Sequence, residues 1–121
     1  MGKPILCLDF DGVLHSYKSG WKGADCIPDP PVDGAMSFIM EAMEHFTVHI
    51  FSSRSNQPGG RSAMRAWIYK NSGGAPWVDD LEYPTEKPAA FLTIDDRALT
   101  FDGTWPSMET LLSFKPWNKR S

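Results

Sequence analysis

The sequence has little of what would set it apart from an ordinary globular protein. Its only cysteines are Cys7 and Cys26, too few for a disulfide framework or a zinc cluster. It contains no apolar run near the roughly 20 residues that a membrane-spanning helix needs, and its first residues lack the apolar segment of a signal peptide. Repeats and low-complexity tracts are absent too. We therefore expect a cytoplasmic protein with free thiols and no membrane partner.

Charge is also limited, at a formal net value of −3. This balance argues against nonspecific binding of nucleic acid by the whole surface, although a local basic patch remains compatible with it. The contents of 41% hydrophobic and 22% charged residues are typical of a folded chain. A length of 121 residues predicts one domain over residues 1–121, and the sequence does not indicate an oligomeric state.

The most informative segment lies near the N-terminus. Residues 4–8 form a short apolar run that predicts a buried strand of a parallel sheet, and Asp9, Asp11 and Gly12 follow it. Ligands of parallel sheets bind beyond the carboxyl ends of strands. Side chains two residues apart in an extended chain point the same way, so Asp9 and Asp11 can face one cation or one phosphoryl group. Since Asp-Gly is also a common turn dipeptide, a purely structural turn is the alternative.

Helical and strand patterns alternate along the rest of the chain. Apolar residues recur at helical spacing in three segments: 31–46, 58–71 and 107–114. Further strands are predicted, the last two from weaker patterns, at 47–51, 91–94, 77–83 and 100–101. Residues 15–31 are rich in Gly and Pro and predict a flap loop beside the site. The alternation predicts an α/β fold with a mostly parallel sheet of about five strands.

Polar side chains follow or precede the predicted strands at four places. In chain order they are Asp9 with Asp11, Ser52, Lys87, and Asp95 with Asp96. The carboxyl ends of parallel strands meet at one edge of a sheet, so we expect these residues to converge. Each has a structural explanation when taken alone: Ser and Asp cap helices and turns, and a lysine is usually a solvated surface residue.

These motifs, in this order, resemble the four motifs of the haloacid dehalogenase-like hydrolase superfamily. The matching residues are Asp9-x-Asp11-Gly12, Ser52 after an apolar strand, Lys87, and Asp95-Asp96 after another apolar strand. The match spans most of the chain. It implies a Rossmann-like three-layer sandwich, and the short gaps between motifs leave no room for a cap domain.

The resemblance implies hydrolysis of a phosphate monoester through an aspartyl-phosphate. Asp9 would be the nucleophile and Asp11 the general acid and base. Ser52 would donate a hydrogen bond to a phosphoryl oxygen, and Lys87 would offset negative charge. Superfamily members that displace halide lack an acid at the position of Asp11, so phosphoryl chemistry is favoured here.

Mg²⁺ is the cofactor that the resemblance implies, because this hard ion prefers oxygen ligands. Its expected ligands are Asp9, the main-chain carbonyl of Asp11, Asp95 and Asp96. Further contacts with the phosphorylated substrate are expected from Gly12, Ser53 and Arg54. Arg54 with Arg61 and Arg65 could hold a neighbouring phosphate, although the last two also fit a solvated helix face.

Two questions about function stay open at this level. The segments around Ser52 and Asp95 are loosely similar to the phosphatase domain of polynucleotide kinase-phosphatases, so a nucleic-acid end is one candidate substrate and a small molecule another. A non-catalytic phosphoacceptor or phospholigand-binding domain is the alternative class. Receiver domains, its best example, place their phosphorylated Asp after a middle strand, where this chain has Ser52.

Overall fold

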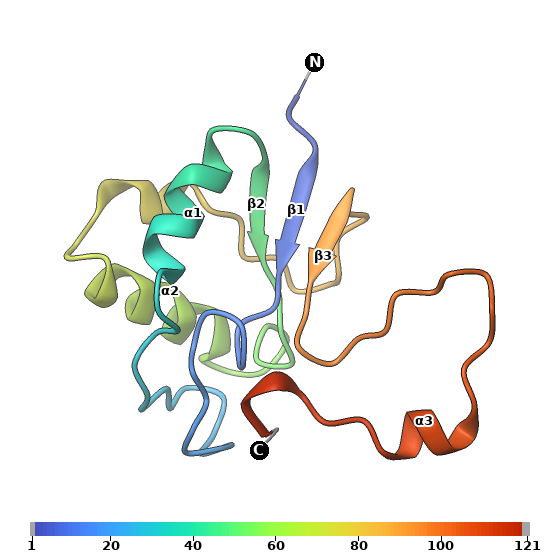
Figure 1. The fold of residues 1–121 in the computed structure, drawn as a ribbon. Helices are drawn as coiled ribbons and strands as arrows, with labels where there is room; N and C mark the ends of the chain where they lie inside the picture. The colour runs from blue at the N-terminus through green and yellow to red at the C-terminus, as the bar shows by residue number, and fades with distance from the viewer. Residues whose placement is uncertain (1, 120–121) are drawn as a thin grey trace.

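The computed structural model describes residues 2–119 and has a small α/β fold (Figure 1). Its elements are β1 (Ile5–Leu8), α1 (Ala35–Met43), β2 (Thr47–Ile50), α2 (Gly60–Asn71), the 3-10 helix η1 (Pro76–Asp80), β3 (Leu92–Ile94), α3 (Met108–Leu112) and the 3-10 helix η2 (Trp117–Lys119). The strands form one parallel sheet in the order β2-β1-β3. Within residues 2–119, no helix has the length and apolar character to cross a membrane.

The apolar core lies on the sheet face that carries Leu8. Leu8 pairs with Ile50 on one side and with Ile94 on the other, and alternation along each strand gives these residues a common face. Helices α1 and α2 contribute to the same core cluster, through residues such as Ile39 and Ile68, both fully buried. Their buried positions recur every three or four residues, as the sequence pattern predicts for amphipathic helices.

The sheet has fewer strands than the sequence predicts. Among residues 2–119 it has three, and the predicted strand at 77–83 is mostly the 3-10 helix η1, which Pro76 begins. A proline at this position favours a helical turn and cannot donate to a ladder. Glu82 alone extends the sheet, by one parallel bridge to His49 at the outer edge of β2. The expectation of about five strands is therefore wrong.

The predicted strand at 100–101 is not formed either, and it belongs to a segment that leaves the rest of the fold, residues 2–96, which we call the body. We call residues 97–115 the arm; Figure 1 shows it looping away from β3 and returning towards the carboxyl ends of the strands. Its helix α3 is capped by Ser107, whose side chain accepts a hydrogen bond from the Thr110 N–H. The apolar spacing at 107–114 suggests a helix that packs inward with Met108, Leu111 and Leu112, but Leu112 is 88% exposed, so this interpretation is wrong.

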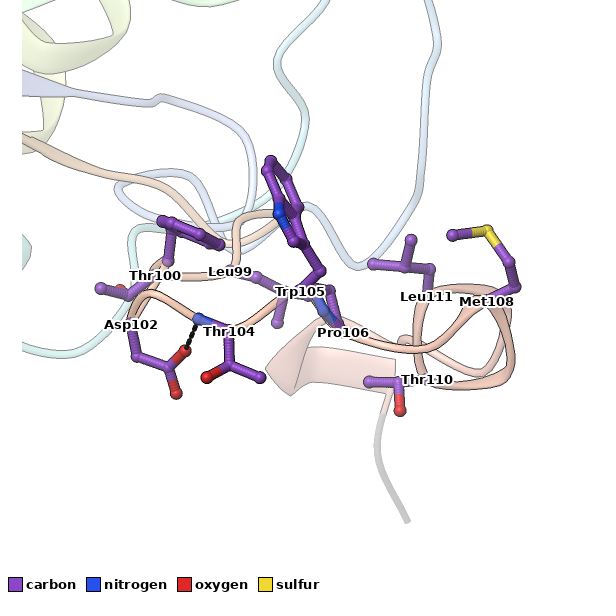
Figure 2. Close-up of a pocket in the computed structure, with 10 residues that line it drawn as sticks. Leu99, Thr100, Asp102, Thr104, Trp105, Pro106, Met108, Thr110 and Leu111 are labelled. Carbon is purple, nitrogen blue, oxygen red and sulfur yellow. Dashed lines mark hydrogen bonds between the residues drawn. The ribbon is translucent and has the colours of Figure 1, made fainter.

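A hollow of about 790 Å³ lies within the arm itself (Figure 2). Figure 2 shows Trp105 projecting from the loop beside it, with Met108 and Leu111 on α3. The Phe101 and Trp105 rings lie 4.7 Å apart between centroids, yet both remain more than half exposed. These two rings therefore contact each other while most of their surface stays exposed.

Candidate active site

Most of the predicted site residues converge on one small pocket at the carboxyl ends of the strands. The pocket has a volume of about 140 Å³, and its lining is Cys7, Asp9, Phe51, Ser52, Ser53, Lys87, Thr93 and Asp95. These residues come from β1 and β3, from the segments that follow the three strands, and from the segment before β3. Asp9, Ser52, Lys87 and Asp95 thus lie around one cavity, although up to 86 positions separate them in the sequence.

Cys7, Phe51 and Thr93 line the pocket without being expected from the motifs, and strand alternation could have found the first and the last of them. Cys7 and Thr93 stand two positions before Asp9 and Asp95, so they share their side of the sheet. They are also register partners across β1 and β3. Burial raises the pKa of the Cys7 thiol, while the nearby Lys87 ammonium acts in the opposite direction. Cys7 therefore serves as a neutral wall of the pocket.

Three carboxylates form a tight acidic cluster. Asp9, Asp95 and Asp96 each offer an oxygen atom, and these atoms lie within 4.8 Å of one another. Burial raises the pKa of Asp9 to about 8, helped by a hydrogen bond with the Asp96 carboxyl and by the negative charge of Asp95. Such a cluster needs a proton or a cation to offset its charge.

The donor set of this cluster fits Mg²⁺. All three groups are carboxylate oxygens, the ligands that this hard ion takes in proteins. Their mutual repulsion and the high pKa of Asp9 are what a divalent cation would relieve. Asp9, Asp95 and Asp96 are the residues that could hold it.

Gly12 lies directly against this cluster. A Cβ atom at residue 12 would stand only 2.2 Å from Oδ2 of Asp96, and Gly12 has a φ of +84° that other residues rarely adopt. Its N–H donates to the His15 carbonyl at 2.8 Å. Glycine is therefore required at this position by backbone geometry, in addition to any contact with a substrate.

Asp11 lies in a buried ion-pair network beside the pocket. Its carboxylate accepts hydrogen bonds from Arg54 Nε at 2.9 Å, from Arg54 Nη2 at 3.1 Å and from His15 Nδ1 at 2.8 Å. Burial opposes the charged form, but these bonds outweigh it and lower the pKa of Asp11. His15 Nε2 accepts the Asp29 N–H, which assigns the imidazole proton to Nδ1. The network keeps Asp11 ionised.

Arg54 holds the flap instead of facing the pocket. It is fully buried, and its Nη1 donates to the carbonyls of Gly23, Ala24 and Cys26. Its guanidinium also lies 4.8 Å from the Trp21 ring centroid. Every nitrogen of Arg54 therefore has a partner within the protein, and the structure gives it a role in positioning Asp11 and the flap.

Ser52 was expected to donate a hydrogen bond to a phosphoryl oxygen, and its neighbour Ser53 lines the same pocket. The Ser52 side chain is buried: its oxygen accepts the Arg54 N–H at 3.0 Å and lies 3.5 Å from Met64 Sδ. Ser53 is exposed and lines the same pocket. The hydroxyl that is free to meet a ligand in this arrangement is thus that of Ser53.

The remaining arginines of helix α2 have local partners. Arg61 Nε donates to the Tyr83 carbonyl at 2.6 Å, and Arg65 forms an exposed ion pair with Asp79. Both were considered as phosphate ligands together with Arg54. Because Arg54 is fully buried, the three guanidinium groups do not form one surface patch for a polynucleotide phosphate.

Two residues with site contacts escaped the sequence patterns. His15 was assigned only to the flap, and nothing in its spacing predicts the bond to Asp11. Trp117 donates its indole N–H to the Gly12 carbonyl at 2.7 Å, from 105 positions away. A contact of that range between a lone tryptophan and a main-chain atom leaves no periodic signal.

Comparisons of the chain with protein-family models, with curated proteins and with solved structures gave no match.

Proposed function

We propose that this protein is a Mg²⁺-dependent phosphatase of the haloacid dehalogenase-like type, which hydrolyses a phosphate monoester. The observation that carries the proposal is the convergence of Asp9, Lys87 and Asp95 with a serine hydroxyl around one pocket. A carboxylate nucleophile, a cation and a hydroxyl donor are the groups that phosphoryl transfer requires. A purely structural strand end has no need for all of them.

Asp9 is the nucleophile in this mechanism. Its carboxylate attacks phosphorus, the bond to the leaving oxygen breaks, and an aspartyl-phosphate forms that water then hydrolyses. The Lys87 ammonium offsets the charge of the phosphoryl group, and the exposed Ser53 hydroxyl donates to one of its oxygens. Ser52 supports the loop by accepting the Arg54 N–H.

Asp9, Asp95 and Asp96 are the ligands that would hold Mg²⁺. When bound there, the ion supplies positive charge that lowers the repulsion between the acidic cluster and an incoming phosphate. The close oxygen atoms of the three side chains support this assignment.

Asp11 is better suited to act as a general base than as a general acid, because it is held in its ionised form. Its bonds to Arg54 and His15 favour the carboxylate, which can take a proton from the attacking water. For the leaving oxygen, protonation by Asp11 requires that one of these bonds loosens. Substrates whose leaving group needs no proton, such as aryl phosphates, are therefore expected to react fastest.

A small molecule and a polynucleotide end both remain candidate substrates, and the arginine contacts within the protein weaken the second. The non-catalytic alternative, a domain that only binds a phosphorylated partner, is separated from a phosphatase by turnover alone.

The test is phosphate release from an aryl phosphate, glycerol phosphate and a 3′-phosphorylated oligonucleotide, each with and without Mg²⁺. We expect Mg²⁺-dependent release from the wild type and none from Asp9→Asn. Asp102→Asn, the same change on the exposed arm, is the control and should keep the wild-type rate. Release that survives in Asp9→Asn would overturn the nucleophile, and binding of phosphate esters without turnover would favour the non-catalytic alternative.

A further inference from the structure

The C-terminal end of the described chain is attached to the loop that follows Asp9. We call residues 116–118 the clasp. Pro116 is buried, Trp117 Nε1 donates to the Gly12 carbonyl at 2.7 Å, and Asn118 Nδ2 donates to the Ser16 carbonyl at 3.3 Å. The clasp therefore joins the C-terminal end of the described chain to the loop after Asp9.

The clasp bond acts on a backbone unit that is already tightly constrained. The Gly12 N–H donates to the His15 carbonyl, which fixes the planar peptide that joins Asp11 to Gly12. The Gly12 carbonyl belongs to the next peptide, and Trp117 fixes that one. With both planes held, the φ and ψ of Gly12 have little freedom.

Gly12 in turn limits where the Asp96 carboxylate can lie. The Gly12 backbone approaches that side chain closely, since a Cβ at residue 12 would stand 2.2 Å from its Oδ2. A small rotation of Gly12 would therefore press on Asp96 or open a gap beside it. A carboxylate oxygen of Asp96 lies within 4.8 Å of one of Asp9, so the disturbance would reach the nucleophile.

We propose that Trp117 is a positioning residue of the site: by holding the Gly12 carbonyl, its indole N–H fixes the turn against which Asp96 and Asp9 are aligned. The inference rests on the proposed function and adds to it a residue from the far end of the chain. Trp117 touches neither the pocket nor the substrate, and it acts through Gly12.

Trp117→Phe isolates this bond. Trp117 is 51% exposed, and phenylalanine keeps an aromatic side chain at this position but lacks the indole N–H. We expect kcat for an aryl phosphate to fall about tenfold at unchanged KM, and the Mg²⁺ dissociation constant from calorimetry to rise several-fold, as for a lost hydrogen bond to a buried acceptor. The Tm should fall by no more than about 6 °C, which leaves the variant folded in the assay.

Two further variants separate positioning from general stability. Trp105→Phe makes the same substitution on the arm, at a ring that is 83% exposed, and should match the wild type. Asn118→Ala removes the other clasp bond but leaves Gly12 held, so it should lower Tm slightly and keep kcat and the Mg²⁺ affinity. Wild-type kcat and Mg²⁺ affinity in Trp117→Phe, or an equal loss in Asn118→Ala, would overturn the inference.

The calorimetric readout keeps the two proposals apart. If the wild type binds Mg²⁺ but releases no phosphate, the proposed function fails, and the effect of Trp117→Phe on Mg²⁺ affinity still decides the role of the clasp. A wild type that neither binds Mg²⁺ nor releases phosphate would overturn both.

Discussion

The body, residues 2–96, and the arm, residues 97–115, have similar apolar side chains but use them in opposite ways. In the body, Ile39, Met64 and Ile68 are fully buried in one core cluster. In the arm, Trp105 and Leu112 are more than four-fifths exposed. Apolar composition alone therefore does not decide burial: the body residues have a sheet face to cover, whereas the arm residues have no partner of that kind in the described chain.

The largest effect on folding should come from the buried ion pair of the body. Arg54→Met leaves the Asp11 carboxylate buried without its main partner and frees three flap carbonyls, so we expect a loss of about 3–5 kcal/mol in the free energy of unfolding. The same change at the exposed Arg97 should cost little. Urea unfolding monitored by circular dichroism measures both, and equal losses would remove the distinction between body and arm.

Truncating an apolar side chain should lower the free energy of unfolding much more in the body than in the arm, and this is the second largest expected effect. Ile68→Ala creates a cavity in the core and should cost about 2–5 kcal/mol. Leu112→Ala removes an exposed side chain and should stay within about 0.5 kcal/mol. A cost above 2 kcal/mol for Leu112→Ala, from the same urea titrations, would mean that the arm packs against something in solution.

The arm and the body should also differ in how readily their backbone amides open to hydrogen exchange. The amides of the arm have few hydrogen bonds to the body and should exchange within seconds, while those of β1 and α2 should be protected up to the global unfolding energy. Hydrogen exchange read by mass spectrometry would resolve the segments. Protection of residues 99–112 comparable to that of β1 would contradict the description of the arm as a separate region.

The smallest expected effect concerns association. Leu112→Lys should leave the Tm almost unchanged and should reduce any concentration-dependent scattering, because it breaks up the exposed apolar surface of α3. Static light scattering over a concentration series provides the measurement. A fall in Tm of many degrees would indicate that Leu112 is covered in solution.

Sequence patterns predicted the α/β class, the first two strands, β3 and the two main helices, because these elements bury periodic apolar faces. They also brought together Asp9, Ser52, Lys87 and Asp95, since strand ends of a parallel sheet share an edge. The weak strands at 77–83 and 100–101 failed because their few apolar residues fit a turn as well as a strand.

The roles of individual side chains were harder to predict than their convergence. Arg54 was expected to face a phosphate, yet in the structure it is buried on Asp11 and the flap. Ser52 and Ser53 are adjacent, and only the fold decides which hydroxyl is buried. Such choices depend on long-range hydrogen bonds, which no local spacing encodes.

The arm is attached at both ends, at Asp96 and at Trp117, and this makes it a place where sequence can be added. Its tip around Gly103 is exposed, and a Cβ there would meet no atom within 4 Å. Because the entropy of closing a flexible loop grows slowly, each doubling of its length costs only about 0.6 kcal/mol. A reporter peptide or a small folded module inserted at this tip should leave the sheet and the pocket intact, because no arm residue lines the pocket.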